Sequence, residues 1–242
     1  PRARLTNRTI CAVMRGAIVK MGPPADPVLS IDIPSVEKTN ELMRQCDRVL
    51  ATGGGAMVTA AYSSGTPALG VGVGNAVITV DETADLDDAA AKGGHIMSDD
   101  EKQKFEDVLW INGAINAKVV AQTPQFIAGM AGFAVSDDVE FFIIPETGYG
   151  PDHPFSGEKM TVSMALYRAR DLDHAIELTN NIQAYQGQGH SCGIYSQSDE
   201  NIMKLANITR TSRVMVNQPQ AASNSGNLWN GMRQTFSLGC GS

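Results

Sequence analysis

The sequence lacks three features that mark common classes of protein. No apolar run approaches the length of a membrane span, so neither a transmembrane helix nor a membrane partner is expected. The 19 Lys and Arg residues form no cluster and the net charge is −7, which argues against a nucleic-acid-binding face. The four cysteines lie far apart without a CxxC pair, which argues against a disulfide scaffold or a zinc site and favours reduced thiols in a cytoplasm.

The chain does show a regular alternation of helical and strand patterns. Apolar spacing and Gly or Pro breaks predict helices over 5–21, 36–46, 56–64, 85–92, 98–109, 123–133, 171–182 and 198–208. Apolar runs between these segments predict strands over 28–33, 48–52, 68–74, 76–81, 140–145, 160–167, 191–196 and 213–219. This rhythm predicts an α/β fold in which helices cover the faces of a parallel sheet.

Glycine is concentrated in one stretch, at positions 53, 54, 55, 65, 70, 72 and 74. Its first part, RVLAT-GGG-AMVTAAYSS, reads as a strand, a glycine turn and a helix. Free N–H groups and a positive dipole at the start of that helix would suit a phosphate or pyrophosphate. No GK[ST] follows the glycines and the spacing is not G-x-G-x-x-G, so neither common nucleotide fingerprint is present. A tight turn with close helix–strand packing is the alternative.

Several segments together carry a resemblance to a known family. They are ATGGGAMVTAAYSSGTPALGVGVGN, VDETADLDDAA, EFFIIPE, PFSGEKMTVSMALYRARDLDHAIE, GQGHSCGIYS, RVMVNQP and LGCGS. In this order, and over essentially the whole chain, they resemble the CoA-acylating aldehyde dehydrogenases. Within that family the chain looks more similar to the acylating sulfoacetaldehyde and succinate-semialdehyde enzymes than to the bifunctional aldehyde-alcohol type.

The resemblance implies an aldehyde-dehydrogenase-like fold with a Rossmann-type cofactor domain and an α/β catalytic domain. Residues 1–92 would belong to the NAD(P)-binding domain, 93–235 to the catalytic domain, and 236–242 to a segment returning near the active site. The implied enzyme oxidises a short aldehyde to its acyl-CoA through a Cys thioester, using NAD or NADP with coenzyme A as co-substrate. An anionic aldehyde such as sulfoacetaldehyde or succinate semialdehyde is the candidate substrate, and a homo-oligomer is expected.

The resemblance also implies a set of cofactor-binding residues. It assigns the turn at Thr52, Gly53 and Gly54 to NAD contacts, Gly72 to a position near the nicotinamide, and Glu158 to the nicotinamide ribose. It places Leu238 in the lining of the active site. The alternatives are packing for the glycines, a surface salt bridge for Glu158 and a core position for Leu238.

Two functional residues of the family have no counterpart in the sequence. The nucleophilic Cys is expected between Lys92 and Gly93, and the oxyanion-stabilising Asn before Pro1. We therefore expect that residues are absent at both places. The segment LGVGVGN carries no carboxylate where hydrolytic relatives hold a water-activating glutamate, so a thioester would persist until CoA attacks.

The remaining candidates leave alternatives open. Arg233 lies in the loop expected near the aldehyde and would bind a sulfonate or carboxylate tail, unless it is a solvated surface residue. Cys192 and His190, two residues apart, would face one side of a strand and suggest a Cys/His acyl transferase. A noncatalytic nucleotide-binding or scaffold remnant of the family is the other alternative.

Overall fold

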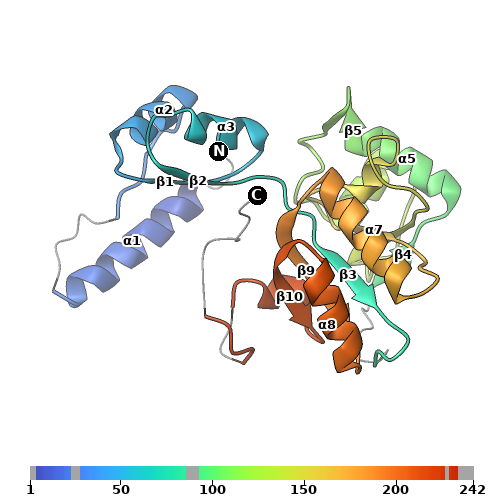
Figure 1. The fold of residues 1–242 in the computed structure, drawn as a ribbon. Coiled ribbons are helices and arrows are strands. Elements are labelled where there is room, and N and C mark those ends of the chain that lie inside the picture. The colour runs from blue at the N-terminus through green and yellow to red at the C-terminus, as the bar shows by residue number, and fades with distance from the viewer. Residues whose placement is uncertain (1–3, 23–27, 86–92, 227–228, 234–242) are drawn as a thin grey trace. The chain divides into compact units, whose positions relative to one another are not determined.

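The computed structural model describes residues 4–22, 28–85, 93–226 and 229–233. The chain divides into two compact units, one formed by Pro1–Ala51 and Ala56–Gly70 and the other by Thr52–Gly55 and Val71–Ser242 (Figure 1). Helices alternate with strands in both units, and the two three-stranded sheets are parallel, so the expected α/β fold is confirmed. No helix among these residues is long and apolar enough to cross a membrane.

The first unit contains a βαβ arrangement next to two longer helices. Its elements are α1 (Arg4–Lys20), α2 (Val36–Gln45), β1 (Val49–Thr52), α3 (Gly55–Tyr62) and β2 (Ala68–Val71). The amide of Val49 donates to Pro67 O at 2.9 Å and that of Gly53 to Val71 O at 3.1 Å, so β1 and β2 run parallel. Met43, Ala51 and Ala61 form the small core of this unit.

One strand expected in the first unit is absent. Residues 28–33 form bends and irregular structure instead of a strand. Their polar groups are bound by helices: Asn7 Nδ2 donates to Ser30 Oγ at 3.0 Å, and Lys38 Nζ donates to Ile33 O at 3.0 Å. The alternation of apolar residues predicted a strand wrongly, because these backbone and side-chain groups bond to α1 and α2 rather than to a neighbouring strand.

The second unit holds two parallel sheets. The first has the order β10-β9-β3, from β3 (Val77–Val80), β9 (Gly189–Tyr195) and β10 (Thr211–Val216). Helices α7 (Leu172–Tyr185) and α8 (Asp199–Ile208) contact each other and pack on β3 and β10, while α9 (Gln220–Ser223) follows β10. Cys192 of β9 is paired with Val77 on one side and Val214 on the other, which places it in the middle of the sheet.

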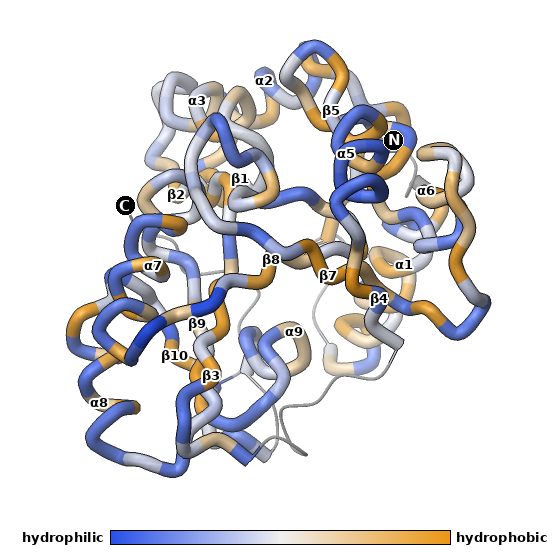
Figure 2. The backbone as a smooth tube through the Cα atoms, turned by 90° about the vertical axis from the view of Figure 1, so that its right-hand side faces the viewer, coloured by the Kyte–Doolittle hydropathy of each residue, from blue (hydrophilic) through white to orange (hydrophobic). Residues whose placement is uncertain are grey.

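The second sheet has the order β4-β7-β8, from β4 (Gly94–Ile96), β7 (Phe141–Pro145) and β8 (Ser163–Leu166). Beside it lie α5 (Asp99–Leu109), the hairpin β5 (Trp110–Ile111) and β6 (Ala114–Ile115), α6 (Pro124–Ala131) and the 3-10 turn η1 (Pro154–Ser156). Helix α5 begins with a capping box, in which Ser98 and Glu101 bond each other's backbone amides. Figure 2 shows β7 as mostly hydrophobic.

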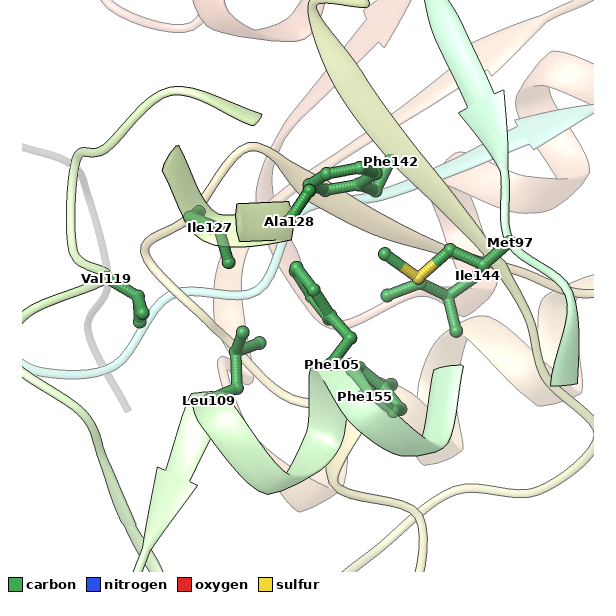
Figure 3. Close-up of a cluster of buried hydrophobic side chains, with 9 residues drawn as sticks. All are labelled: Met97, Phe105, Leu109, Val119, Ile127, Ala128, Phe142, Ile144 and Phe155. Carbon is green, nitrogen blue, oxygen red and sulfur yellow. The ribbon is translucent and has the colours of Figure 1, made fainter. Parts of the chain in front are cut away.

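The main core of the second unit lies against this sheet (Figure 3). Its members are Met97, Phe105, Leu109, Val119, Ile127, Ala128, Phe142, Ile144 and Phe155. Phe105 meets Phe142 edge to face with ring centroids 5.0 Å apart, and Phe155 meets Trp110 in the same way at 4.9 Å. The turn that carries Phe155 is therefore anchored directly in the core.

The sequence pattern missed some elements and misplaced some ends. Strand β4 and the hairpin β5–β6 are two or three residues long, too short to show a periodicity. Strand β2 ends at Val71, three residues earlier than expected, because the segment 72–75 bonds to a distant loop. The helix expected over 85–92 lies outside the described residues apart from Asp85, and the domain boundary at 92/93 stays a prediction.

Replacing the buried ring of Phe142 should destabilise the second unit. We expect Phe142→Ala to lower the free energy of unfolding by about 3–5 kcal/mol, through lost burial and a cavity. Phe126→Ala is the control, since Phe126 on α6 is 48% exposed, and it should cost less than about 1 kcal/mol. Urea unfolding followed by circular dichroism measures both values, and equal losses would contradict the assigned core.

Candidate functional site

The turn after β1 offers open backbone. The amide of Gly53 donates to Val71 O, and α3 begins two residues later at Gly55. A Cβ added at Gly54 or at Gly55 would meet no other atom of the described chain within 4 Å. Close packing therefore does not explain these two glycines. Their exposed amides, at the positive end of a helix, fit the approach of an anionic group such as a pyrophosphate.

Other glycines of the same stretch are explained by packing. A Cβ at Gly70 would lie 2.6 Å from Val58 Cγ1 and 2.8 Å from Tyr62 Cε2, so this position needs glycine. At Gly72, by contrast, an added Cβ would again meet no described atom within 4 Å. The packing alternative is thus right for Gly70, whereas Gly54 and Gly72 lie in open space at the ends of β1 and β2.

Glu158 reaches the segment that follows β2. Its Oε2 accepts a hydrogen bond from the amide of Gly74 at 3.1 Å, across 84 residues of sequence. Its own amide donates to Gln186 Oε1 at 3.0 Å. Glu158 and Gly72 are both expected to bind the cofactor. The structure brings Glu158 into contact with Gly74, two residues along the chain from Gly72. This half-buried carboxylate therefore bonds to backbone of a distant segment, and its role in cofactor binding stays a prediction.

Three segments converge around this hydrogen bond. Asn75 Nδ2 donates to Ser156 O at 2.6 Å, which adds a second bond between 72–75 and the turn before Glu158. The ring of His190 covers Gly74, where an added Cβ would lie 2.3 Å from Cδ2. We call Gly72, Gly74, Asn75, Glu158 and His190 the Glu158 cluster. All of its members belong to the second unit.

His190 is the titratable ring of this cluster. Burial lowers the pKa of its imidazole, the nearby Glu158 carboxylate opposes that shift, and Arg213 adds to it. Its Nδ1 lies 2.8 Å from Ser191 Oγ, which fixes the ring. At neutral pH the ring is therefore uncharged and able to accept a proton. The sequence had singled out His190 only as a partner of Cys192.

The Cys192 and His190 pair is not supported. Cys192 is completely buried, with its Sγ beside the hydroxyls of Thr209 and Thr211 at 3.8 and 3.5 Å. Burial raises the pKa of its thiol, which disfavours the reactive thiolate. His190 bonds Ser191 instead of Cys192. The acyl-transferase interpretation was therefore wrong, because the strand places Cys192 in the core with Ile176, Ile194 and Leu205.

The other expected site residues are less well defined. Thr52 is exposed at the end of β1, beside the open turn. Arg233 is also exposed, at the limit of the described residues. Leu238 and Lys92 lie outside the described residues. Their roles stay predictions.

The chain is similar to proteins of known activity. No protein-family model matches it. Over its whole length it is 36% identical to a sulfoacetaldehyde dehydrogenase of Acholeplasma and 34% identical to a bifunctional aldehyde-alcohol dehydrogenase of Escherichia coli, of which it spans 58% and 32%. Its fold matches an acetylating aldehyde dehydrogenase of Geobacillus thermoglucosidasius with a TM-score of 0.88 and 31% identity, over 96% of this chain and 59% of that one.

Two details of these similarities bear on the expectations. The alignment with the Acholeplasma protein runs over 282 positions against 242 residues here, so that relative holds at least 40 residues inside the matched span without a counterpart. The identities of 36% and 34% are too close to separate the sulfoacetaldehyde branch from the bifunctional type. In sequence and fold, the whole chain is similar to acylating aldehyde dehydrogenases, of whose length it spans about three fifths or less.

Proposed function

We propose that this chain is part of a CoA-acylating aldehyde dehydrogenase, which oxidises a short aldehyde to its acyl-CoA with NAD or NADP. The observation that carries the proposal is the Glu158 cluster, which joins Glu158 to the end of β2 through the amide of Gly74. The similarity to acylating enzymes over the whole chain supports the same reaction. A cytoplasmic homo-oligomer that binds the aldehyde and coenzyme A completes the proposal.

The described residues fit a nicotinamide dinucleotide. The turn of Thr52, Gly53 and Gly54 would take the pyrophosphate at the open backbone of Gly54, because a strand end and a helix start meet there, whereas the amide of Gly53 already donates to Val71 O. Glu158 would accept hydrogen bonds from ribose hydroxyls, and the exposed backbone of Gly72 leaves room beside it. When bound, the nicotinamide supplies the acceptor for the hydride of the aldehyde.

His190 is proposed to move a proton in this reaction. Its ring is uncharged at neutral pH and half-buried, it packs over Gly74 and bonds Ser191 Oγ, and the charge of Glu158 acts on it. Such a ring can take a proton from a thiol, including that of coenzyme A, and so make the thiol a better nucleophile.

We further propose that the nucleophilic cysteine belongs to a segment that the relatives carry between the counterparts of Lys92 and Gly93. The 40 additional aligned positions of the Acholeplasma protein support an absent internal segment. Cys192 cannot replace it, since burial raises the pKa of that thiol. The alternative is a noncatalytic nucleotide-binding or scaffold remnant. It is favoured by the 40 unmatched positions and by the raised pKa of the Cys192 thiol. Nucleotide binding without CoA-dependent turnover would support this remnant over the enzyme.

Removing the charge of Glu158 should weaken nucleotide binding. We expect Glu158→Gln to raise the Kd for NAD+ or NADP+ by about tenfold, because hydrogen bonds to an ionised group are the stronger ones. Titration calorimetry of the whole chain measures this constant. Glu177→Gln, on α7, is the matched control and should keep the wild-type affinity. An unchanged Kd for Glu158→Gln would contradict the proposed cofactor site.

Arg233 is proposed to select an anionic aldehyde such as sulfoacetaldehyde or succinate semialdehyde. In the active enzyme, Arg233→Ala should raise the KM for sulfoacetaldehyde by about tenfold or more and leave that for acetaldehyde nearly unchanged, since only the first offers a charged tail. Initial rates with both aldehydes in the presence of CoA test this selection. Equal changes in the two KM values would show that Arg233 does not bind the tail.

A further inference from the structure

The turn that presents Glu158 is held by a buried lysine. Lys159 is only 8% exposed, although lysine is among the residues least often buried. Its Nζ donates to the carbonyl of Phe155 at 2.7 Å and to that of Gly157 at 2.9 Å. Both acceptors belong to the turn directly before Glu158, so the ammonium bridges two carbonyls of this turn.

The carbonyl between these two acceptors has a different partner. Ser156 O accepts from Asn75 Nδ2, and Ser156 itself is 2% exposed. Three successive carbonyls are thus satisfied, two by Lys159 and one by the segment after β2. A buried carbonyl left without a donor costs free energy, so loss of the ammonium would favour a rearranged turn. Any such rearrangement would move Ser156 and Glu158, which make the two side-chain bonds to 72–75.

From this geometry we infer that Lys159 is a positioning residue for cofactor binding, because it holds the turn that aims Glu158 at Gly74 and Ser156 at Asn75. The inference rests on the proposed function, in which Glu158 contacts the ribose of NAD(P). Lys159 itself need not touch the cofactor. It acts through Glu158, whose backbone amide is fixed separately by Gln186.

The charges around Lys159 give the inference a pH dependence. Burial lowers the pKa of its ammonium to about 8, against the attraction of Glu146 and Glu158. Glu146 in turn faces Lys102 of α5 and His153, and its charge also acts on Tyr167. Lys159 is therefore mostly charged at pH 7 and mostly neutral at pH 9.5. The two charge-assisted bonds weaken as pH rises through about 8.

The test is the Kd for NAD+ of the whole chain between pH 7 and pH 9.5. We expect the wild-type Kd to rise by about tenfold over this range, since two hydrogen bonds lose their charged donor. Lys159→Met should bind about tenfold more weakly at pH 7 and show little pH dependence. Lys118→Met, at an exposed lysine, is the matched control and should follow the wild-type profile.

Glu158→Gln separates this inference from the proposed function. If Lys159 acts through Glu158, the glutamine variant should also lose most of the pH dependence. Wild-type affinity in Glu158→Gln would overturn the cofactor site itself. A different result would overturn only the role of Lys159: Glu158→Gln binds NAD+ more weakly, while Lys159→Met keeps the wild-type affinity and pH dependence. If Lys159→Met fails to fold, two other results would overturn the role of Lys159. One is a wild-type Kd for NAD+ that does not change between pH 7 and pH 9.5, and the other is a Glu158→Gln variant that keeps the full pH dependence.

Discussion

The buried carboxylate of Glu146 is the group on which the loop between β7 and β8, residues 146–162, depends. Its side chain is 3% exposed, and an ion so far from water must be paired. Burial would raise its pKa, but bonds from Thr147, Lys102 and His153 together lower it, so it stays ionised. These partners come from the loop itself and from α5. Glu146 therefore fixes the loop where it leaves β7, and Lys159 fixes the same loop where Glu158 begins.

The glycine-rich stretch follows from two different requirements. Gly70 and Gly74 are small because Tyr62, Val58 and the ring of His190 lie where a Cβ would be. Gly54 and Gly72 are small without any such neighbour, at the two strand ends where a dinucleotide would bind. The first requirement is close packing, and the second is the exposed backbone that the proposed site needs.

The sequence predicted the longer elements better than the site. Segments with a full period of apolar residues, such as α1, α5, α7 and β9, lie where they were expected. The wrong strand at 28–33 and the missed β4 and β5–β6 depend on partners that no local pattern reveals. Glu158 was found by resemblance alone. Its partners Gly74 and Gln186 escaped notice because they meet it across 84 and 28 residues of chain, and so did Asn75, which bonds the neighbouring Ser156 across 81 residues.

If the Glu158 cluster binds the cofactor, the segments 52–55, 72–75 and 154–159 of the second unit act as one nucleotide site. Hydrogen–deuterium exchange with and without saturating NAD+ or NADP+ tests this most directly. The account predicts slower exchange in all three segments together, including the amides of Gly54 and Gly74, and no change in α5. Unchanged exchange in these segments at saturating nucleotide, or protection confined to other parts of the chain, would contradict it.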